Sequence, residues 1–427
     1  MISRKVLAVS FAFALLSLGC KRRIDTPLRD ADSVLLITLD TTRADRLGCY
    51  GYEPGRTPAL DGLAARGVLF EQAFAQAPLT LPSHATMMTG RYPREHGLRV
   101  NGRGRLGGHH PTLASLFKER GYHTGAFVGS YALDSRFGLD RGFDVYVDDM
   151  SSEGASSPFE LRAGVVTDRA LEWLAAGKRQ PFFCWVHYFD PHDPYSPPKA
   201  FRVDDMDPYD GEIAYVDSQV RRLLDWLERS GWMRRTVVIV VGDHGESFGE
   251  HRESGHTDFL YDTNLHVPLI FAHPTLAVGG GRVGGVVEVA DLFPTIVQLV
   301  GLKLPKDVLS RSLADALGGG KLEPRVAYSE SLYLFSAFGW AQQRSVTSSE
   351  WKYISSTKAE LYNRRSDPHE KENLIDTHAE VAVELLDTLR ERYDSMIPSH
   401  IAAVDGKNGD DALRALGYLR GRGVDSA

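Results

Sequence analysis

Cysteine is scarce in this chain of 427 residues, which contains only Cys20, Cys49 and Cys184. Three widely spaced cysteines exclude a disulfide scaffold and a zinc knuckle, because both need cysteines paired at short spacing. We expect Cys49 and Cys184 to be buried free thiols beside or within strands. Long apolar runs are also missing after residue 19, which excludes a polytopic membrane protein.

A surplus of positive charge is missing as well. Lysine and arginine number 49 against 56 aspartates and glutamates, which gives a net charge of −7. A dedicated nucleic-acid-binding protein needs a cationic surface to displace counterions from phosphates, so we expect no nucleic-acid partner. Hydrophobic residues at 43% and charged residues at 25% are ordinary values for a globular protein, and they exclude intrinsic disorder.

Residues 1–19 have the features of a secretory signal: a positive start, a short apolar core and small residues at the end. The segment Ser17-Leu18-Gly19-Cys20 resembles a bacterial lipobox, although Ser17 stands where leucine is usual. We therefore expect an exported protein of the periplasm or cell envelope that is anchored to the membrane by a lipid on Cys20. An ordinary cleaved signal peptide with an incidental cysteine is the alternative.

From Asp32 onward, short β-branched runs alternate with helical stretches, which is typical of a parallel sheet covered by helices on both faces. The pattern predicts strands over residues 33–39, 123–129, 181–187, 236–241 and 267–271, and helices over 57–67, 111–120, 165–176 and 209–230. After about Gly320 the segments become shorter and predict antiparallel strands over 326–330, 340–346, 351–354 and 360–362, then a helix over 379–395.

These patterns predict an α/β fold with a large mixed, mostly parallel sheet between helices and a small C-terminal antiparallel-sheet subdomain. We expect the catalytic domain over residues 33–320, the subdomain over 324–398 and a tail over 399–427.

Polar side chains follow several of the predicted strands at the point where each strand ends. Asp40 follows the first strand, Asp243 and His244 follow the strand over 236–241, and His192 lies just beyond the strand over 181–187. Ligands of open α/β sheets collect outside the carboxyl ends of the strands. Two carboxylates and an imidazole at one pole predict a divalent metal site with mixed oxygen and nitrogen ligands. His187 either approaches this pole or is a hydrogen-bonded residue at a strand end.

A hydroxyl group precedes a predicted helix that begins near Pro82, since proline suits the first helical turn. Thr80 would then lie just before the helix N-terminus, where unpaired amides and the positive end of the dipole stabilise an anion. Thr80 is therefore a candidate nucleophile. The alternative is that Thr80 and Ser83 only cap the helix, and for Ser83 capping is the favoured interpretation.

The segment Thr80-Leu81-Pro82-Ser83-His84, followed by Thr89-Gly90, resembles a known signature. So do the strand that ends in Asp40, the segment Gly242-Asp243-His244-Gly245-Glu246 and the C-terminal Trp351-Lys352-Tyr353. Together these motifs make the sequence similar to the sulfatase family of the alkaline phosphatase superfamily, in a variant with threonine at the nucleophile position.

The resemblance implies an alkaline phosphatase-like fold and a metal-dependent hydrolase of anionic esters that attacks sulfur or phosphorus in line. It implies Thr80 as the nucleophile, Asp40, Asp243 and His244 as metal ligands, His192 and His256 as catalytic residues near the ester, and Asn101 and His84 as contacts of the substrate anion. The expected cofactor is one divalent ion, calcium, manganese or zinc. His244 stands where calcium sulfatases usually have asparagine, which favours manganese or zinc.

The identity of residue 80 bears on the substrate. Authentic sulfatases convert a cysteine or serine at this position to formylglycine, and threonine cannot form that aldehyde. We therefore expect a phosphoester or phosphonate ester to be favoured over a sulfate ester, in a small molecule or linked to a glycan or lipid. The alternatives are a transferase of phospho groups to envelope glycans or lipids, and an inactive relative that binds polyanions.

Overall fold

The computed structural model describes Leu28 and residues 32–150, 155–157, 159–177, 180–276 and 280–399, with the backbone alone over 155–157. The predicted signal sequence, the lipid acceptor Cys20 and residues 400–427 of the predicted tail lie outside the described residues. Within the described ranges no helix combines the length and the apolar character that crossing a bilayer requires.

A nine-stranded mixed sheet forms the centre of the molecule, in the order β11-β2-β12-β8-β1-β7-β3-β4, with β13 paired to β2. Its strands are β1 (Ser33–Leu39), β2 (Val68–Phe74), β3 (His123–Val128), β4 (Val145–Val147), β7 (Phe182–Tyr188), β8 (Thr236–Gly242), β11 (His266–Val267), β12 (Leu269–Ala272) and β13 (Gly281–Glu288). β8, β1, β7, β3 and β4 run parallel, whereas β12 is antiparallel to both β8 and β2. Every residue of β1, β7 and β8 is buried, as the continuous apolar runs predicted.

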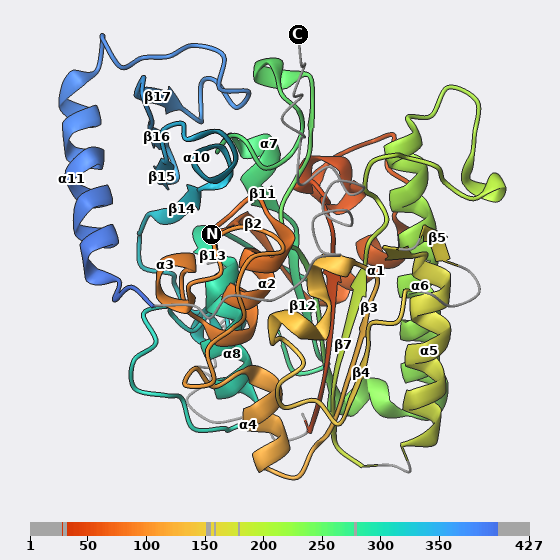
Figure 1. Cartoon of the computed structure of the whole chain (residues 1–427). Coiled ribbons are helices and arrows are strands. Elements are labelled where there is room, and N and C mark those ends of the chain that lie inside the picture. The colour runs from red at the N-terminus through yellow and green to blue at the C-terminus, as the bar shows by residue number, and fades with distance from the viewer. Residues whose placement is uncertain are drawn as a thin grey trace, which may run out of the picture.

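Helices cover both faces of this sheet (Figure 1), with α5 and α6 on one side and α2, α4 and α8 on the other. The helices before the C-terminal sheet are α1 (Pro58–Arg66), α2 (Thr80–Thr89), α3 (Pro93–His96), α4 (Leu113–Glu119), α5 (Ala163–Ala176), α6 (Pro208–Ser230), α7 (Asp262–Leu265), α8 (Leu292–Leu299) and α9 (Ala314–Leu317). Two small hairpins add β5 (Ala155–Ser157), β6 (Glu160–Leu161), β9 (Ser247–Phe248) and β10 (Ser254–Gly255).

The C-terminal part builds a second, antiparallel sheet of β14 (Ala327–Ser331), β15 (Gln343–Thr347), β16 (Trp351–Ser355) and β17 (Glu360–Asn363). α10 (Tyr333–Phe338) connects its first two strands, and α11 (Ala379–Ser395) packs against the sheet, at the left of Figure 1. A separate hydrophobic cluster lies between them and includes Val346, Leu361 and Leu385. The predicted fold class, a mostly parallel sheet between helices with a C-terminal antiparallel sheet, is confirmed.

Several elements differ from the sequence-based expectation. β2 and β13 are strands that the pattern did not predict, because Glu71 and Gln72 interrupt the apolar run of β2 and five glycines lie near or within β13. The predicted strand over 267–271 is divided at Pro268, which lacks the amide hydrogen that a ladder needs. The predicted strand over 340–346 begins only at Gln343.

Candidate active site

Three neighbouring strands bring the predicted metal ligands together at their carboxyl ends. β1 lies between β8 and β7, with Leu39 in register with Gly242 on one side and Tyr188 on the other. The ladder continues for one further residue, because the amide of Asp40 donates to the carbonyl of Tyr188 at 3.0 Å. The amide of Asp243 likewise donates to the carbonyl of Leu39 at 3.1 Å. The two carboxylates therefore project side by side from the edge of the sheet.

Asp40, Asp243 and His244 form a compact, fully buried group of possible ligands. Nε2 of His244 lies 3.5 Å from Oδ1 of Asp40 and 3.5 Å from Oδ2 of Asp243. Nδ1 of His244 is 3.0 Å from the carbonyl oxygen of Gly245, which can only accept, so Nδ1 carries the hydrogen and Nε2 presents a lone pair. Three electron-rich atoms thus face one another.

The carboxylate oxygens of this group are not compensated by short hydrogen bonds in the part of the chain that the structure describes. Among the described residues, neither carboxylate oxygen of Asp40 nor Oδ2 of Asp243 has a hydrogen-bond partner. Burial raises the pKa of Asp40, and burial together with the charge of Asp40 raises the pKa of Asp243. Two buried carboxylates beside an imidazole lone pair need a positive charge between them. The two carboxylates and the imidazole nitrogen therefore fit a divalent cation that takes mixed oxygen and nitrogen ligands.

A second group, His84, His187 and Asp243, also lies within ligating distance, but its hydrogen bonds make it a poor metal site. Nδ1 of His84 is 2.8 Å from the carbonyl oxygen of Thr80, so it carries the hydrogen, and its other nitrogen is 3.0 Å from the Thr38 hydroxyl. Burial lowers the pKa of His84 and of His187 to about 3, which makes both rings neutral at physiological pH.

His187 has a defined orientation as well. Its Nδ1 accepts a hydrogen bond from the amide of Gly129 at 3.4 Å, which leaves the hydrogen on Nε2. That Nε2 faces Oδ2 of Asp40 at 3.4 Å, a distance beyond the usual range for a strong hydrogen bond. His187 therefore approaches the predicted metal pole, but with a hydrogen rather than a lone pair.

Thr80 lies at the start of α2 with its hydroxyl turned toward the metal-ligand group. Its Oγ1 is 3.4 Å from Nε2 of His244, and the residue is fully buried. The helix begins at Thr80 itself, one residue earlier than predicted, and Leu79 in the N-cap position supplies no side-chain hydrogen bond. The predicted capping role of Ser83 is wrong, because its hydroxyl donates to the carbonyl of Asp243 at 2.7 Å. Ser83 instead holds α2 against the end of β8.

Asn101 contacts the same helix end. Its Oδ1 accepts from the amide of Leu81 at 2.8 Å, whereas its buried Nδ2 has no hydrogen-bond partner among the described residues. A buried amide donor beside the first turn of a helix suits an anion. The predicted anion contact of His84 stays a prediction, and in the structure its ring lies behind Thr80, against the carbonyl oxygen of that residue.

The two other predicted histidines lie beside His244. The ring centroid of His256 is 4.5 Å from that of His244 and 5.1 Å from that of His192. Nδ1 of His192 donates to the carbonyl of Asp193 at 2.7 Å, and its ring stacks on Phe189. The structure thus brings all the predicted metal, catalytic and anion-contact residues to one pole of the sheet.

One further carboxylate at this pole was not among the predicted site residues. Oε1 of Glu246 is 3.2 Å from Nδ1 of His256. Burial opposes protonation of this ring, but the carboxylate of Glu246 together with the charges of Asp40 and Glu253 outweighs burial, and the pKa of His256 is raised. The position of Glu246, two residues after His244 at a strand end, was the signal that could have identified it.

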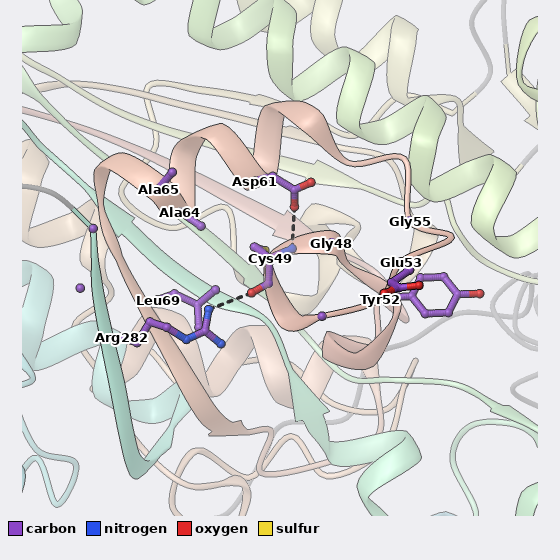
Figure 2. Close-up of a pocket in the computed structure, with 13 residues that line it drawn as sticks. Gly48, Cys49, Tyr52, Glu53, Gly55, Asp61, Ala64, Ala65, Leu69 and Arg282 are labelled. Atoms are coloured by element: carbon purple, nitrogen blue, oxygen red, sulfur yellow. Dashed lines mark hydrogen bonds between the residues drawn. The ribbon is translucent and has the colours of Figure 1, made fainter.

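A surface pocket of 780 Å³ lies elsewhere, beside α1 and the start of β13 (Figure 2), and none of the predicted site residues lines it. The amide of Cys49 donates to Asp61 there, and the carbonyl of Cys49 accepts from Arg282. Burial raises the pKa of the Cys49 thiol to about 12, so this thiol is not a nucleophile at physiological pH. The catalytic chemistry is therefore expected at the sheet pole and not in this pocket.

Comparison with known proteins gives matches over most of the chain. The Sulfatase family model matches residues 32–302, and the model of the N-sulphoglucosamine sulphohydrolase C-terminal region matches residues 249–396. The chain is 27% identical over 420 residues to a Delta 4,5-hexuronate-2-O-sulfatase of Bacteroides thetaiotaomicron, with 81% of this chain and 85% of that protein covered.

Solved structures share the fold. A structure in complex with D-glucosamine-2-N,6-O-disulfate superposes with a TM-score of 0.73 at 19% identity, over 85% of this chain and 97% of the other. The phosphonate monoester hydrolase of Agrobacterium radiobacter superposes with a TM-score of 0.73 at 22% identity, over 85% of this chain and 96% of the other. At these identities the likeness concerns the fold alone.

Proposed function

The chain belongs to the sulfatase family and is an ester hydrolase, and we propose that it cleaves anionic esters with Thr80 as the nucleophile and one divalent metal ion as cofactor. The single observation that carries this proposal is the position of the Thr80 hydroxyl. It lies 3.4 Å from Nε2 of His244, at the first residue of α2 and beside carboxylate oxygens for which the described residues provide no hydrogen-bond partner.

Asp40, Asp243 and His244 would hold the metal ion. The bound ion would supply Lewis acidity, lowering the pKa of the Thr80 hydroxyl and polarising a non-bridging oxygen of the substrate. The chain contributes the rest of the anion site. Nδ2 of Asn101, whose Oδ1 accepts from the amide of Leu81 at the start of α2, would donate to the substrate anion and stabilise charge there without reorganisation.

The reaction would proceed in two displacements. The Thr80 hydroxyl gives up its proton to solvent, and its oxygen forms a bond to the sulfur or phosphorus atom while the bond to the leaving alcohol breaks. His256, held through Nδ1 by Glu246, gives a proton to the leaving oxygen. Water then attacks the covalent threonine ester and gives a proton to His256, while the bond from the Thr80 oxygen to phosphorus or sulfur breaks. That oxygen takes a proton back from solvent, which restores the Thr80 hydroxyl. His192 would balance charge on the equatorial oxygens.

The substrate preference follows from the residue at position 80. Threonine cannot be converted to formylglycine, so we propose that a phosphoester or phosphonate ester is cleaved faster than a sulfate ester. A threonine alkoxide is an oxygen nucleophile that suits attack at phosphorus, with a tetrahedral covalent ester as the product of the first step. The name of the B. thetaiotaomicron relative, a hexuronate sulfatase, supports a sugar as the alcohol part.

We also propose that the protein is exported and anchored through Cys20. The basis for this part is the sequence of residues 1–20 alone. Fractionation of cells that express the full chain, with Cys20→Ala as the matched variant, tests it. Release of the variant from the membrane fraction would support the anchor, and an unchanged distribution would contradict it.

The catalytic proposal is tested with purified protein that is freed of metal and reloaded with calcium, manganese or zinc. Aryl sulfate, phosphate monoester, phosphodiester and phosphonate monoester are compared, with Thr80→Ala as the test variant. Thr89→Ala, in the last turn of the same helix, is the control for folding. We expect metal-dependent cleavage of a phosphorus ester that Thr80→Ala loses and Thr89→Ala keeps. Wild-type rates in Thr80→Ala would refute the proposal, and dominant sulfate turnover would refute the preference.

A further inference from the structure

The segment that carries His192 follows β7 and runs from residue 190 to residue 196. We call it the histidine loop. Two of its residues, Pro191 and Pro194, have no amide hydrogen and so cannot donate main-chain hydrogen bonds. Side chains from neighbouring elements must therefore hold much of this loop in place, and they decide where the His192 ring lies.

Arg162, the residue before α5, contacts the histidine loop at both of its ends. Its Nη1 donates to Oδ1 of Asp190 at 2.8 Å, and its Nη2 donates to the carbonyl of Ser196 at 2.9 Å. The same Nη1 donates to Oε1 of Glu212 on α6 at 3.0 Å, and this oxygen also accepts from the amide of Ser196 at 2.9 Å. The amide of Ala163 donates to Oδ2 of Asp190 at 2.8 Å. One guanidinium thus joins the start of α5, the helix α6 and both ends of the loop.

The contacts of Arg162 lie largely out of water. Asp190 and Glu212 are 3% and 1% exposed, and the Arg162 side chain is 25% exposed. Burial raises the pKa of Asp190, and the positive charge of Arg162 opposes this rise. A buried ion cluster contributes little net stability compared with apolar side chains of similar volume, but its directed hydrogen bonds fix one geometry. The cluster is therefore better suited to placing the loop than to stabilising the fold.

The histidine loop lies against the candidate active site. The carbonyl of Pro191 accepts from the hydroxyl of Thr41, the residue after Asp40. The His192 ring stacks on Phe189, with the centroids 4.3 Å apart, and its centroid is 5.1 Å from that of His256. Arg162 bonds to the loop on either side of His192, so a change at Arg162 reaches the site through this loop.

We propose that Arg162 is a positioning residue, which sets His192 over the substrate anion by holding the histidine loop at Asp190 and Ser196. This inference rests on the proposed function, in which His192 balances charge on the equatorial oxygens. Lysine cannot replace Arg162, because a single ammonium lacks the planar fork that meets Asp190, Glu212 and the carbonyl of Ser196 together. A displacement of about 1 Å in a site can lower the rate by about 100-fold.

The first test measures the order of the loop without turnover. Arg162→Lys is compared with Arg222→Lys, because Arg222 on α6 pairs with Asp168 on α5 at the surface and so links the same two helices (Figure 1). Hydrogen-exchange mass spectrometry follows the peptide over residues 189–198 and the peptide of β7 in metal-loaded protein.

We expect the loop peptide of Arg162→Lys to exchange about tenfold faster than that of the wild type, with β7 unchanged, and Arg222→Lys to match the wild type. Wild-type exchange of the loop in Arg162→Lys would overturn the inference. If Arg162→Lys does not fold, Glu212→Gln carries the same test, since it keeps an acceptor for the amide of Ser196 but removes a charge that holds Arg162.

The second test asks whether Arg162 acts through His192. Arg162→Lys should lower kcat/KM by about 10–100-fold in otherwise wild-type protein. In His192→Ala it should lower kcat/KM by less than about twofold, because the ring that the loop places is already absent. An equal fractional loss in the two backgrounds would overturn the inference. Failure of the proposed function is distinguishable, because it is read from turnover by Thr80→Ala, whereas the order of the loop is read from hydrogen exchange.

Discussion

His187 offers a sharp test of how the metal ligands are oriented. The structure turns its Nε2–H toward Oδ2 of Asp40 at 3.4 Å and its Nδ1 toward the amide of Gly129. We predict that His187→Phe weakens metal binding without removing a ligand. Phenylalanine keeps a planar ring in this buried position but can neither donate to Asp40 nor accept from Gly129.

The expected magnitude follows from these two contacts. Partners that orient a metal ligand typically contribute about 10–100-fold to metal affinity. The 3.4 Å separation from Asp40 is long for a hydrogen bond, so we expect the lower end, about tenfold. The amide of Gly129 would lose its side-chain acceptor in a buried setting, which we expect to lower the free energy of unfolding by about 1–3 kcal/mol.

Calorimetric titration of manganese and of zinc into metal-free protein measures the affinity and the number of ions bound. His123→Phe, at the exposed first residue of β3, is the matched control and should behave as the wild type. An unchanged affinity in His187→Phe would refute the positioning role. A fall from two bound ions to one would refute the assigned hydrogen positions, because His187 would then be a ligand of a second ion.

Two further predictions concern buried polar residues. The Nζ of Lys352, which is fully buried, lies 2.7 Å from Asp262 and 3.0 Å from Glu370, so Lys352→Met should lower the free energy of unfolding by about 3–5 kcal/mol in a denaturant titration. Burial raises the pKa of Glu370 to about 7, and removal of the lysine would raise this pKa further. A protonated Glu370 carries no uncompensated charge, so Lys352→Met should lower the free energy of unfolding less at about pH 5.5 than at about pH 8. An equal decrease at both pH values would contradict this prediction. Asn101→Asp keeps an acceptor for the amide of Leu81 but replaces the Nδ2 donor by a carboxylate oxygen. Steady-state kinetics should show kcat/KM lowered by about 100-fold or more. A decrease in kcat/KM below twofold would contradict the anion contact of Asn101.

The sequence predicted the part of the fold that depends on continuous apolar runs. β1 and β8 are buried on both faces, so their sequences are unbroken and end at polar residues, which located Asp40 and Asp243 at one pole. β2 was not predicted because Glu71 and Gln72 are half-buried in the middle of an otherwise buried strand. Its place in the sheet depends on long-range pairing with β12 and β13, which local periodicity does not encode.

The contacts within the site could be predicted less well than its location. The hydroxyl of Ser83 was expected to cap α2, but it reaches the carbonyl of Asp243, a contact that depends on how α2 docks against the sheet. The neutral state of His187 follows from burial, and the position of its hydrogen follows from the amide of Gly129, just after the neighbouring strand β3. Such features arise from tertiary packing between residues far apart in the sequence, and local sequence patterns do not predict them.

The central claim is that Thr80 forms a covalent ester with the substrate group. The most direct measurement is peptide mass spectrometry of metal-loaded protein that is mixed with a phenyl phosphonate monoester and quenched in acid within a turnover. The account predicts a phosphonyl group on the peptide that contains Thr80, and neither adduct nor turnover in Thr80→Ala. Wild-type turnover by Thr80→Ala, or an adduct on another residue, would contradict it.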